Sequence, residues 1–99
     1  MIDRDCIFCK IAGGDIPSST VYEDEQFRVL LDLSPATKGH ALILPKQHYA
    51  NIFEIDENVL RDLIVLAKKV ASAMKETLNC DGVNIVQNNG EAAGQTVFH

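Results

Sequence analysis

The sequence predicts an α+β domain, in which an antiparallel β-sheet of about five strands packs against a short N-terminal helix and one long helix. Two observations carry this prediction. Residues 56–78 repeat apolar side chains about every 3.6 positions, which indicates an amphipathic helix. Elsewhere, short segments of apolar and β-branched residues alternate with turn residues, which indicates strands. A chain of 99 residues has the size of a single domain, so the prediction covers residues 1–99.

The N-terminal half is expected to contain the short helix and three strands. Asp5 is positioned to cap a helix that ends at the two glycines of residues 13–14. A tight connection at residues 23–25 predicts a hairpin, and a loop with proline and glycine follows the second strand. The three strands are expected at residues 20–22, 27–33 and 40–44.

The long helix is expected to begin at Asp56, where the helix dipole favours an anion, and to end near Asn79. Two further strands are expected at residues 83–87 and 95–98, and the second of them reaches His99 incomplete. Hairpin spacing makes the sheet antiparallel, and both helices are expected on one of its faces.

Composition and charge exclude several classes of partner. The formal net charge is −5 and no basic run occurs, so the electrostatic footprint of a nucleic-acid-binding protein is missing. No apolar run approaches the roughly 20 residues of a membrane span. Three cysteines without a secretory signal predict a cytoplasmic protein rather than a disulfide framework.

Cys6 and Cys9 form a C-x-x-C pair, which can hold one tetrahedral ion from a single turn of chain. The chain has three histidines, at positions 40, 48 and 99, and two of them would complete a Cys₂His₂ zinc site. The spacing leaves two alternatives open. C-x-x-C is also the redox motif of thioredoxin-like proteins, and two ordinary cysteines can share a short helix.

Residues 88–96 form a donor-rich loop that can hold a phosphate without any cationic side chain. Gly90 and Gly94 allow backbone N–H groups to approach an anion closely. Side-chain donors are added by Asn88, Gln95 and Thr96. The ordinary alternative is a loop built from turn residues.

Two single residues admit both a functional and a structural interpretation. Asp32 follows an apolar strand and can accept from a sugar hydroxyl pair or from its own backbone in a turn. His40 enters an apolar strand, where a histidine is more often a satisfied core residue than a catalytic one.

Taken in order along the chain, these residues resemble the histidine-triad (HIT) family. Residues 94–99, Gly-Gln-Thr-Val-Phe-His, match the segment that introduces the family's His-x-His-x-His signature and its first histidine. Further segments follow the family in order at residues 6–10, 15–17, 21–24, 31–35, 38–40 and 44–48.

The resemblance implies a role for each matched position. In zinc-bearing bacterial members the corresponding residues bind structural zinc, and here they are Cys6, Cys9, His48 and His99. His40 matches a histidine that supports the nucleophile, and Asp32 matches the carboxylate that holds the ribose hydroxyls. The base pocket is matched by Phe8, Ile11, Ile16, Leu30 and Leu33. Phosphate contacts are matched by Asn88, Gly94 and Thr96.

The family implies hydrolysis or transfer of a nucleoside monophosphate, with the second triad histidine as nucleophile. The second and third triad histidines lie outside the 99 residues, so this chain is expected to bind zinc and a purine nucleotide without turnover. The intact protein is expected to hydrolyse nucleoside phosphoramidates or dinucleoside polyphosphates as a homodimer, with no nucleic-acid or membrane partner. The alternatives are a non-catalytic nucleotide- and zinc-binding regulatory or interaction module, and a thiol redox protein.

Overall fold

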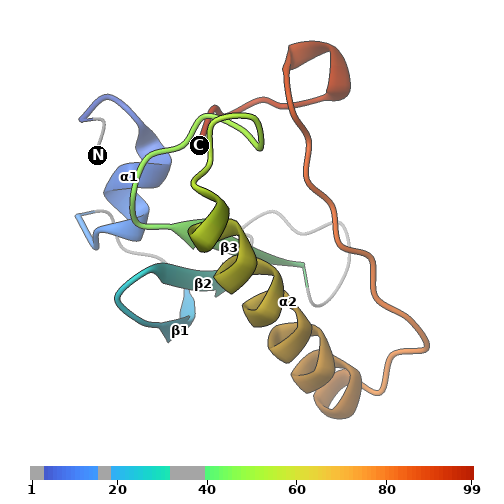
Figure 1. Ribbon diagram of the computed structural model, residues 1–99. Helices are drawn as coiled ribbons and strands as arrows, with labels where there is room; N and C mark the ends of the chain where they lie inside the picture. The colour runs from blue at the N-terminus through green and yellow to red at the C-terminus, as the bar shows by residue number, and fades with distance from the viewer. Residues whose placement is uncertain (1–3, 16–18, 32–39) are drawn as a thin grey trace.

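The computed structural model describes residues 4–15, 19–31 and 40–99. Within these residues the chain forms two α-helices, three strands and one 3₁₀ turn (Figure 1). In chain order they are α1 (Ile7–Ala12), β1 (Thr20–Glu23), β2 (Phe27–Leu31), β3 (Ala41–Pro45), α2 (Glu57–Leu78) and η1 (Glu91–Ala93). In the described part of the chain, no helix is both long enough and apolar enough to cross a membrane.

The three strands form one antiparallel sheet in the order β1-β2-β3, as the hairpin spacing predicts. Val29 lies opposite Ile43 and Leu30 lies opposite Leu42. The register between β1 and β2 shifts once, between Thr20 and Tyr22. β2 is therefore the central strand of the three, and β3 pairs with it along one edge.

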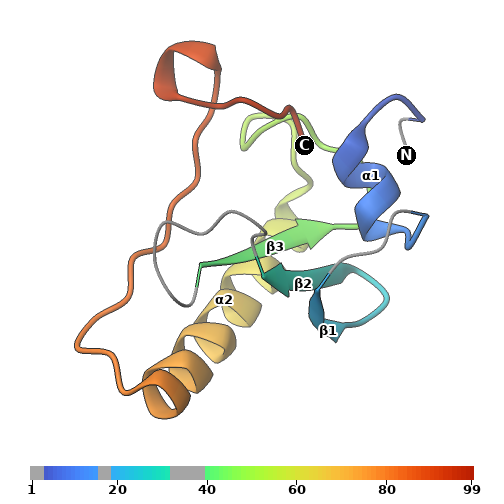
Figure 2. The same ribbon diagram turned by 180° about the vertical axis from the view of Figure 1, so that it is seen from behind.

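The two helices cover opposite faces of this sheet, so the expectation of a single covered face is wrong (Figures 1 and 2). Phe27 and Val29 of β2 pack against Leu66 of α2. Leu30, the next residue along the strand, faces the other way and packs against Ala12 of α1. Since side chains alternate along a strand, β2 carries apolar groups on both faces, and each face needs its own cover.

Helix α2 begins and ends as its sequence predicts. The carboxylate of Asp56 accepts from the backbone N–H groups of Asn58 at 2.8 Å and Val59 at 3.2 Å. Asn79 ends the helix in the left-handed conformation with φ 51°, which asparagine tolerates better than most residues.

The short helix α1 is capped by Cys6, one residue after the predicted Asp5. Cys6 has an extended backbone, and its Sγ accepts from the backbone N–H of Cys9 at 3.4 Å. The sulfur takes the place that an aspartate or serine oxygen commonly occupies at a helix N-terminus.

The strands predicted at residues 83–87 and 95–98 are wrong, and among the described residues the sheet has three strands rather than the expected five. Residues 82–89 have no regular secondary structure, and Ile85 and Val86 are exposed. β-leaning residues make a strand only when a neighbouring strand supplies ladder hydrogen bonds, and no described strand lies beside this segment.

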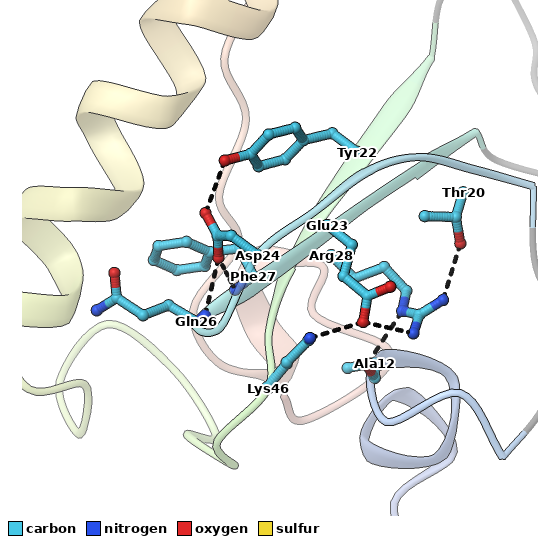
Figure 3. A network of polar contacts seen from close by, with 9 residues as sticks. All are labelled: Ala12, Thr20, Tyr22, Glu23, Asp24, Gln26, Phe27, Arg28 and Lys46. Carbon is cyan, nitrogen blue, oxygen red and sulfur yellow. Dashed lines mark hydrogen bonds and ion pairs between the residues drawn. The ribbon is translucent and has the colours of Figure 1, made fainter.

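A network of polar contacts ties α1 to the sheet (Figure 3). The guanidinium of Arg28 donates from Nε to the carbonyl of Ala12 at 3.1 Å and from Nη2 to Glu23 at 2.9 Å. Lys46 donates to the same Glu23 oxygen at 2.6 Å, and this hydrogen bond from Lys46 lowers the pKa of Glu23. The network therefore joins the end of α1 to the residue that follows β3.

Asp24 closes the hairpin between β1 and β2 (Figure 3). Its Oδ1 accepts from the backbone N–H groups of Gln26 at 2.8 Å and Phe27 at 2.7 Å, and its Oδ2 accepts from the Tyr22 hydroxyl at 2.9 Å. Partial burial raises the pKa of Asp24, but the hydrogen bonds from Phe27, Gln26 and Tyr22 outweigh it. The pKa of Asp24 is therefore held below its ordinary value of 3.8.

Replacing Asp24 by alanine is expected to lower the free energy of unfolding by about 1–2 kcal/mol at neutral pH, because two backbone N–H groups lose their acceptor. Urea denaturation followed by circular dichroism measures this loss. Asp24→Asn keeps the Oδ1 acceptor and is expected to lose less.

Because the pKa of Asp24 is lowered on folding, its contribution to stability is present above about pH 3.8, the ordinary pKa of the group. This contribution is lost as the pH falls through the folded-state pKa. The difference in the free energy of unfolding between the wild type and Asp24→Ala should therefore shrink in strong acid. A gap that stays constant from neutral pH down to about pH 2 would contradict the role assigned to the ionised carboxylate.

Candidate metal centre

Four side chains from three distant parts of the chain meet at one point beside α1. Cys6 caps this helix and Cys9 lies in its first turn. His48 follows the end of β3 by three residues, and His99 is the last residue of the chain. One sulfur or ring nitrogen from each residue lies within 4.8 Å of all the others.

The spacing of these atoms fits a tetrahedral ion. The Nδ1 atom of His99 lies 3.3 Å from the sulfur of Cys6 and 3.4 Å from that of Cys9, and the Nδ1 atom of His48 lies 3.3 Å from Cys9. Zinc bonds of about 2.3 Å to sulfur and about 2.0 Å to nitrogen, at tetrahedral angles, place sulfur and nitrogen roughly 3.5 Å apart. The donor set and these three distances therefore fit a Cys₂His₂ zinc site.

The ring of His99 is held in the orientation that a metal ligand needs. Its Nε2 lies 2.8 Å from the carbonyl oxygen of Pro45, to which it can donate, and this leaves the Nδ1 lone pair facing the thiols. Burial lowers the pKa of His99, and the nearby His48 lowers it further, against the opposing effect of the bond to Pro45. The neutral form, which is the ligating form, is favoured.

The surroundings of the cysteines favour a metal over a redox disulfide. None of the three cysteines forms a disulfide, and Cys9 is buried at 3% exposed. Each sulfur of the C-x-x-C pair meets an imidazole nitrogen. A redox pair needs one accessible thiol to attack a partner, whereas here the half-buried Cys6 and the buried Cys9 each lie against an imidazole nitrogen.

The N–H groups of Gly90 and Gly94 are hydrogen-bonded inside the loop at residues 88–96, and the expected anion role of this loop stays a prediction. Gly90 donates to the side chain of Gln95 at 2.7 Å, and Gly94 donates to the carbonyl of Glu91 at 3.0 Å. The short 3₁₀ turn η1 closes the loop on itself, so these donors already have acceptors.

Three predicted phosphate contacts, Asn88, Gly94 and Thr96, are exposed. A β-carbon at Gly94 would lie 3.5 Å from the amide nitrogen of Asn88, so these two residues are neighbours. Gly94 has φ +94°, a conformation that L side chains rarely adopt. Asn88 and Thr96 present side chains to solvent beside the segment that leads to His99, and their phosphate role stays a prediction.

The predicted base-pocket residues that the structure describes lie together on the α1 face of the sheet. Leu30 is buried, and Phe8 and Ile11 pack against its cluster. The ring of Phe8 also meets that of His99 edge-on, with centroids 6.1 Å apart. Ile16, Asp32 and Leu33 lie outside the described residues.

His40 lies at the end of β3 opposite the metal centre. It directly precedes Ala41, whereas the carbonyl that orients His99 belongs to Pro45. His40 and Pro45 are five positions apart, which along a strand is about 17 Å. His40 is exposed, so it is neither a core residue nor one of the four clustered ligands.

Sequence reasoning missed two features of this site. The carbonyl of Pro45 as the partner of His99 leaves no sequence signal, because a backbone carbonyl is common to every residue. Gln95 was predicted to be a side-chain donor to a bound anion, but it is buried at 7% exposed. The oxygen and the nitrogen of its side-chain amide both form hydrogen bonds within the protein. In the sequence, Gly90 and Gly94 precede Gln95 and a β-leaning segment follows it. This position was the available signal that the amide is structural.

Known proteins of similar sequence match most of this chain. The family model described as "HIT domain" matches residues 13–99. A Bacillus subtilis protein named "Protein hit" is 46% identical over 96 residues, which are 97% of this chain and 66% of that protein. An adenosine 5'-monophosphoramidase from Saccharomyces cerevisiae is 43% identical over 98 residues, which are 99% of this chain and 60% of the yeast protein. The chain thus spans less than two thirds of the length of these relatives.

Solved structures agree in fold. A HIT family protein from Bacillus anthracis superposes with a TM-score of 0.92 at 47% identity, over 97% of this chain and 68% of that one. A zinc-bound histidine triad family protein from Mycobacterium smegmatis superposes with a TM-score of 0.90 at 41% identity, over 96% of this chain and 69% of that one. The second of these is described as holding zinc, which agrees with the donor set assembled here.

Replacing Cys9 by serine is expected to abolish zinc binding, because it removes one of four ligands and leaves the others around an incomplete site. The amount of zinc per chain is measured by inductively coupled plasma mass spectrometry after reconstitution and desalting. The wild type should hold one equivalent. Cys80→Ser is the matched control, since Cys80 is a free cysteine outside the cluster and should leave the zinc content unchanged. Equal loss in the two variants would contradict the assigned ligand set.

Proposed function

The chain belongs to the HIT domain family, and on this premise we propose that it is the larger part of a nucleotide-binding HIT domain whose intact form is a hydrolase or nucleotidyl transferase. The proposed substrates are purine nucleoside phosphoramidates or dinucleoside polyphosphates. The observation that carries the proposal is the placement of His99, the first histidine of the signature. Its ring is anchored to the metal centre and to Pro45 at the end of β3.

The spacing of the signature explains why this placement matters. In a strand, residues at alternate positions point to the same face. The histidines two and four positions after the first would therefore line one face of a strand that continues from His99. If it pairs antiparallel with β3, along the edge that β2 does not occupy, such a strand would run from Pro45 toward Ala41 and hence toward His40. This supports the proposed role of His40 as the residue that assists the nucleophile.

The proposed chemistry has two steps. The neutral imidazole of the second triad histidine attacks the α-phosphorus, a phosphorus–nitrogen bond forms, and the leaving group departs with a proton. Water then attacks the same phosphorus, the bond to histidine breaks, and the nucleoside monophosphate is released. Hydrogen-bond donors on the phosphate oxygens stabilise both transition states, and Asn88 and Thr96 are the proposed side-chain donors.

The remaining assignments follow the same proposal. The base would lie against the cluster of Phe8, Ile11 and Leu30. Asp32, with Ile16 and Leu33, would complete the nucleoside pocket. Zinc would be structural, because its four ligands are all protein side chains and leave no open position for substrate.

The proposed assembly is a cytoplasmic homodimer. Exposed apolar residues on α2 and on the segment that follows it, including Ile64, Ile85 and Val86, support an interface between copies.

The proposed activity predicts AMP release from adenosine 5'-phosphoramidate by a protein extended past His99 through the rest of the signature. Replacing the second triad histidine by alanine should lower kcat/KM by about a thousandfold or more, because the covalent step is lost. Chromatographic measurement of AMP checks both. Addition of AMP should shift the NMR signals of the 99-residue chain, but this chain should release no AMP from adenosine 5'-phosphoramidate.

Three outcomes separate the alternatives. Turnover that depends on the second histidine supports the hydrolase. AMP binding without turnover in the extended protein favours the regulatory module. An extended protein that neither binds nor releases AMP, while an active family member does so in the same assay, would contradict the nucleotide proposal.

A further inference from the structure

We propose that the side-chain amide of Gln95 is a positioning group for the metal centre, which holds the two histidine-bearing segments together in the arrangement that the ion requires. This inference rests on the zinc site proposed above. It concerns a residue that is not a ligand and that acts through the backbone of the segments carrying His48 and His99.

Gln95 is a buried amide at the junction of two loops. Among the residues that the structure describes, it is the one buried polar residue, at 7% exposed. A buried amide is costly unless its donors and acceptor are bonded. The amide of Gln95 meets this requirement with three partners.

The three partners define which end of the amide points where. Oε1 accepts from the backbone N–H of Gly90 at 2.7 Å. Nε2 donates to the carbonyl of Val97 at 3.1 Å and to the carbonyl of Ala50. The orientation is unambiguous because an N–H group needs an acceptor and two carbonyls need donors.

The two carbonyls belong to the segments that supply the imidazole ligands. Ala50 follows His48 by two residues, and Val97 precedes His99 by two residues. The carbonyl of Val97 also accepts from the backbone N–H of His99 at 3.1 Å. One amide nitrogen of Gln95 therefore bridges the segment of His48 to the carbonyl that holds the backbone of His99.

This bridge matters because the two histidines are distant in sequence. Cys6 and Cys9 are placed by one turn of α1, but His48 and His99 lie about half the chain apart, and their rings meet with centroids 5.3 Å apart. Bringing such segments together at the moment of metal binding would cost conformational entropy. A bridge that exists before the ion arrives removes part of that cost from the binding step.

The proposal is tested with two substitutions at Gln95 and one matched control. Gln95→Met has a similar size and removes all three hydrogen bonds. Gln95→Glu keeps an acceptor for the N–H of Gly90 but loses the donors to Ala50 and Val97. Asn89→Ala removes another hydrogen bond between the same two loops, from the N–H of Ile52 to Asn89 at 2.7 Å, without touching either carbonyl.

The readouts are the zinc dissociation constant, from competition with a chromophoric chelator, and the visible absorption of the cobalt-substituted protein. Both Gln95 variants are expected to bind zinc about 10-fold more weakly, at the low end of the effect of losing a direct hydrogen-bond partner of a ligand, because Gln95 acts through the backbone. The cobalt bands of these variants should also shift, because the histidines meet the ion in a changed geometry. Asn89→Ala should match the wild type in both readouts.

Each contrary result has its own meaning. If the wild type binds zinc and Gln95→Glu binds it equally well, Gln95 does not position the ligands, while the zinc site stands. If Asn89→Ala weakens zinc binding equally, loss of any contact between the two loops has the same effect. Gln95 then has no special positioning role, which also overturns the inference. If the wild type binds no metal, the zinc site itself fails and the inference fails with it. Should Gln95→Met fail to fold by circular dichroism, Gln95→Glu decides the question.

Discussion

The meeting of His99 with Cys6, Cys9 and Pro45 is the contact on which the position of residues 79–99 depends. This segment has no ladder hydrogen bonds to the described sheet, and its β-leaning residues are largely exposed. Its described polar attachments to distant segments include those from Asn89 to Ile52, from Gln95 to Ala50 and from His99 to the cluster. An ion bound by four ligands from three segments would convert these few contacts into a strong constraint.

The alternation of side chains along β2 explains why the metal centre lies where it does. Phe27 and Val29 belong to the α2 face, and Leu30 belongs to the α1 face. The cysteines come with α1, so the cluster forms at the rim of that face, next to the end of β3. Arg28 shares this face and links Ala12 at the end of α1 to Glu23, which Lys46 also contacts. The sheet thus holds both the cysteine helix and the chain that leads to His48.

Local patterns were enough to predict α2, the hairpin and the family. The 3.6-residue period and Asp56 determine α2 through interactions that are near in sequence. The four clustered ligands could be named only through the family resemblance, because spacing alone left His40 as an equal candidate. The strand at residues 83–87 was wrong because Val83 and Ile85 have strand propensity, while a ladder depends on a neighbour that local sequence does not encode. Gln95 was misassigned for a related reason, since its partners, Ala50 and Gly90, are defined by how two loops meet.

The exposed extended segment after α2 has a consequence for how the protein behaves at high concentration. Residues 82–90 contain no charged side chain and no proline, and Val86 is 75% exposed. Short uncharged β-prone segments with free backbone groups are the templates on which chains pair with one another. Self-association of this polypeptide is therefore expected to depend on a stretch of chain that does not include Cys6 or Cys9.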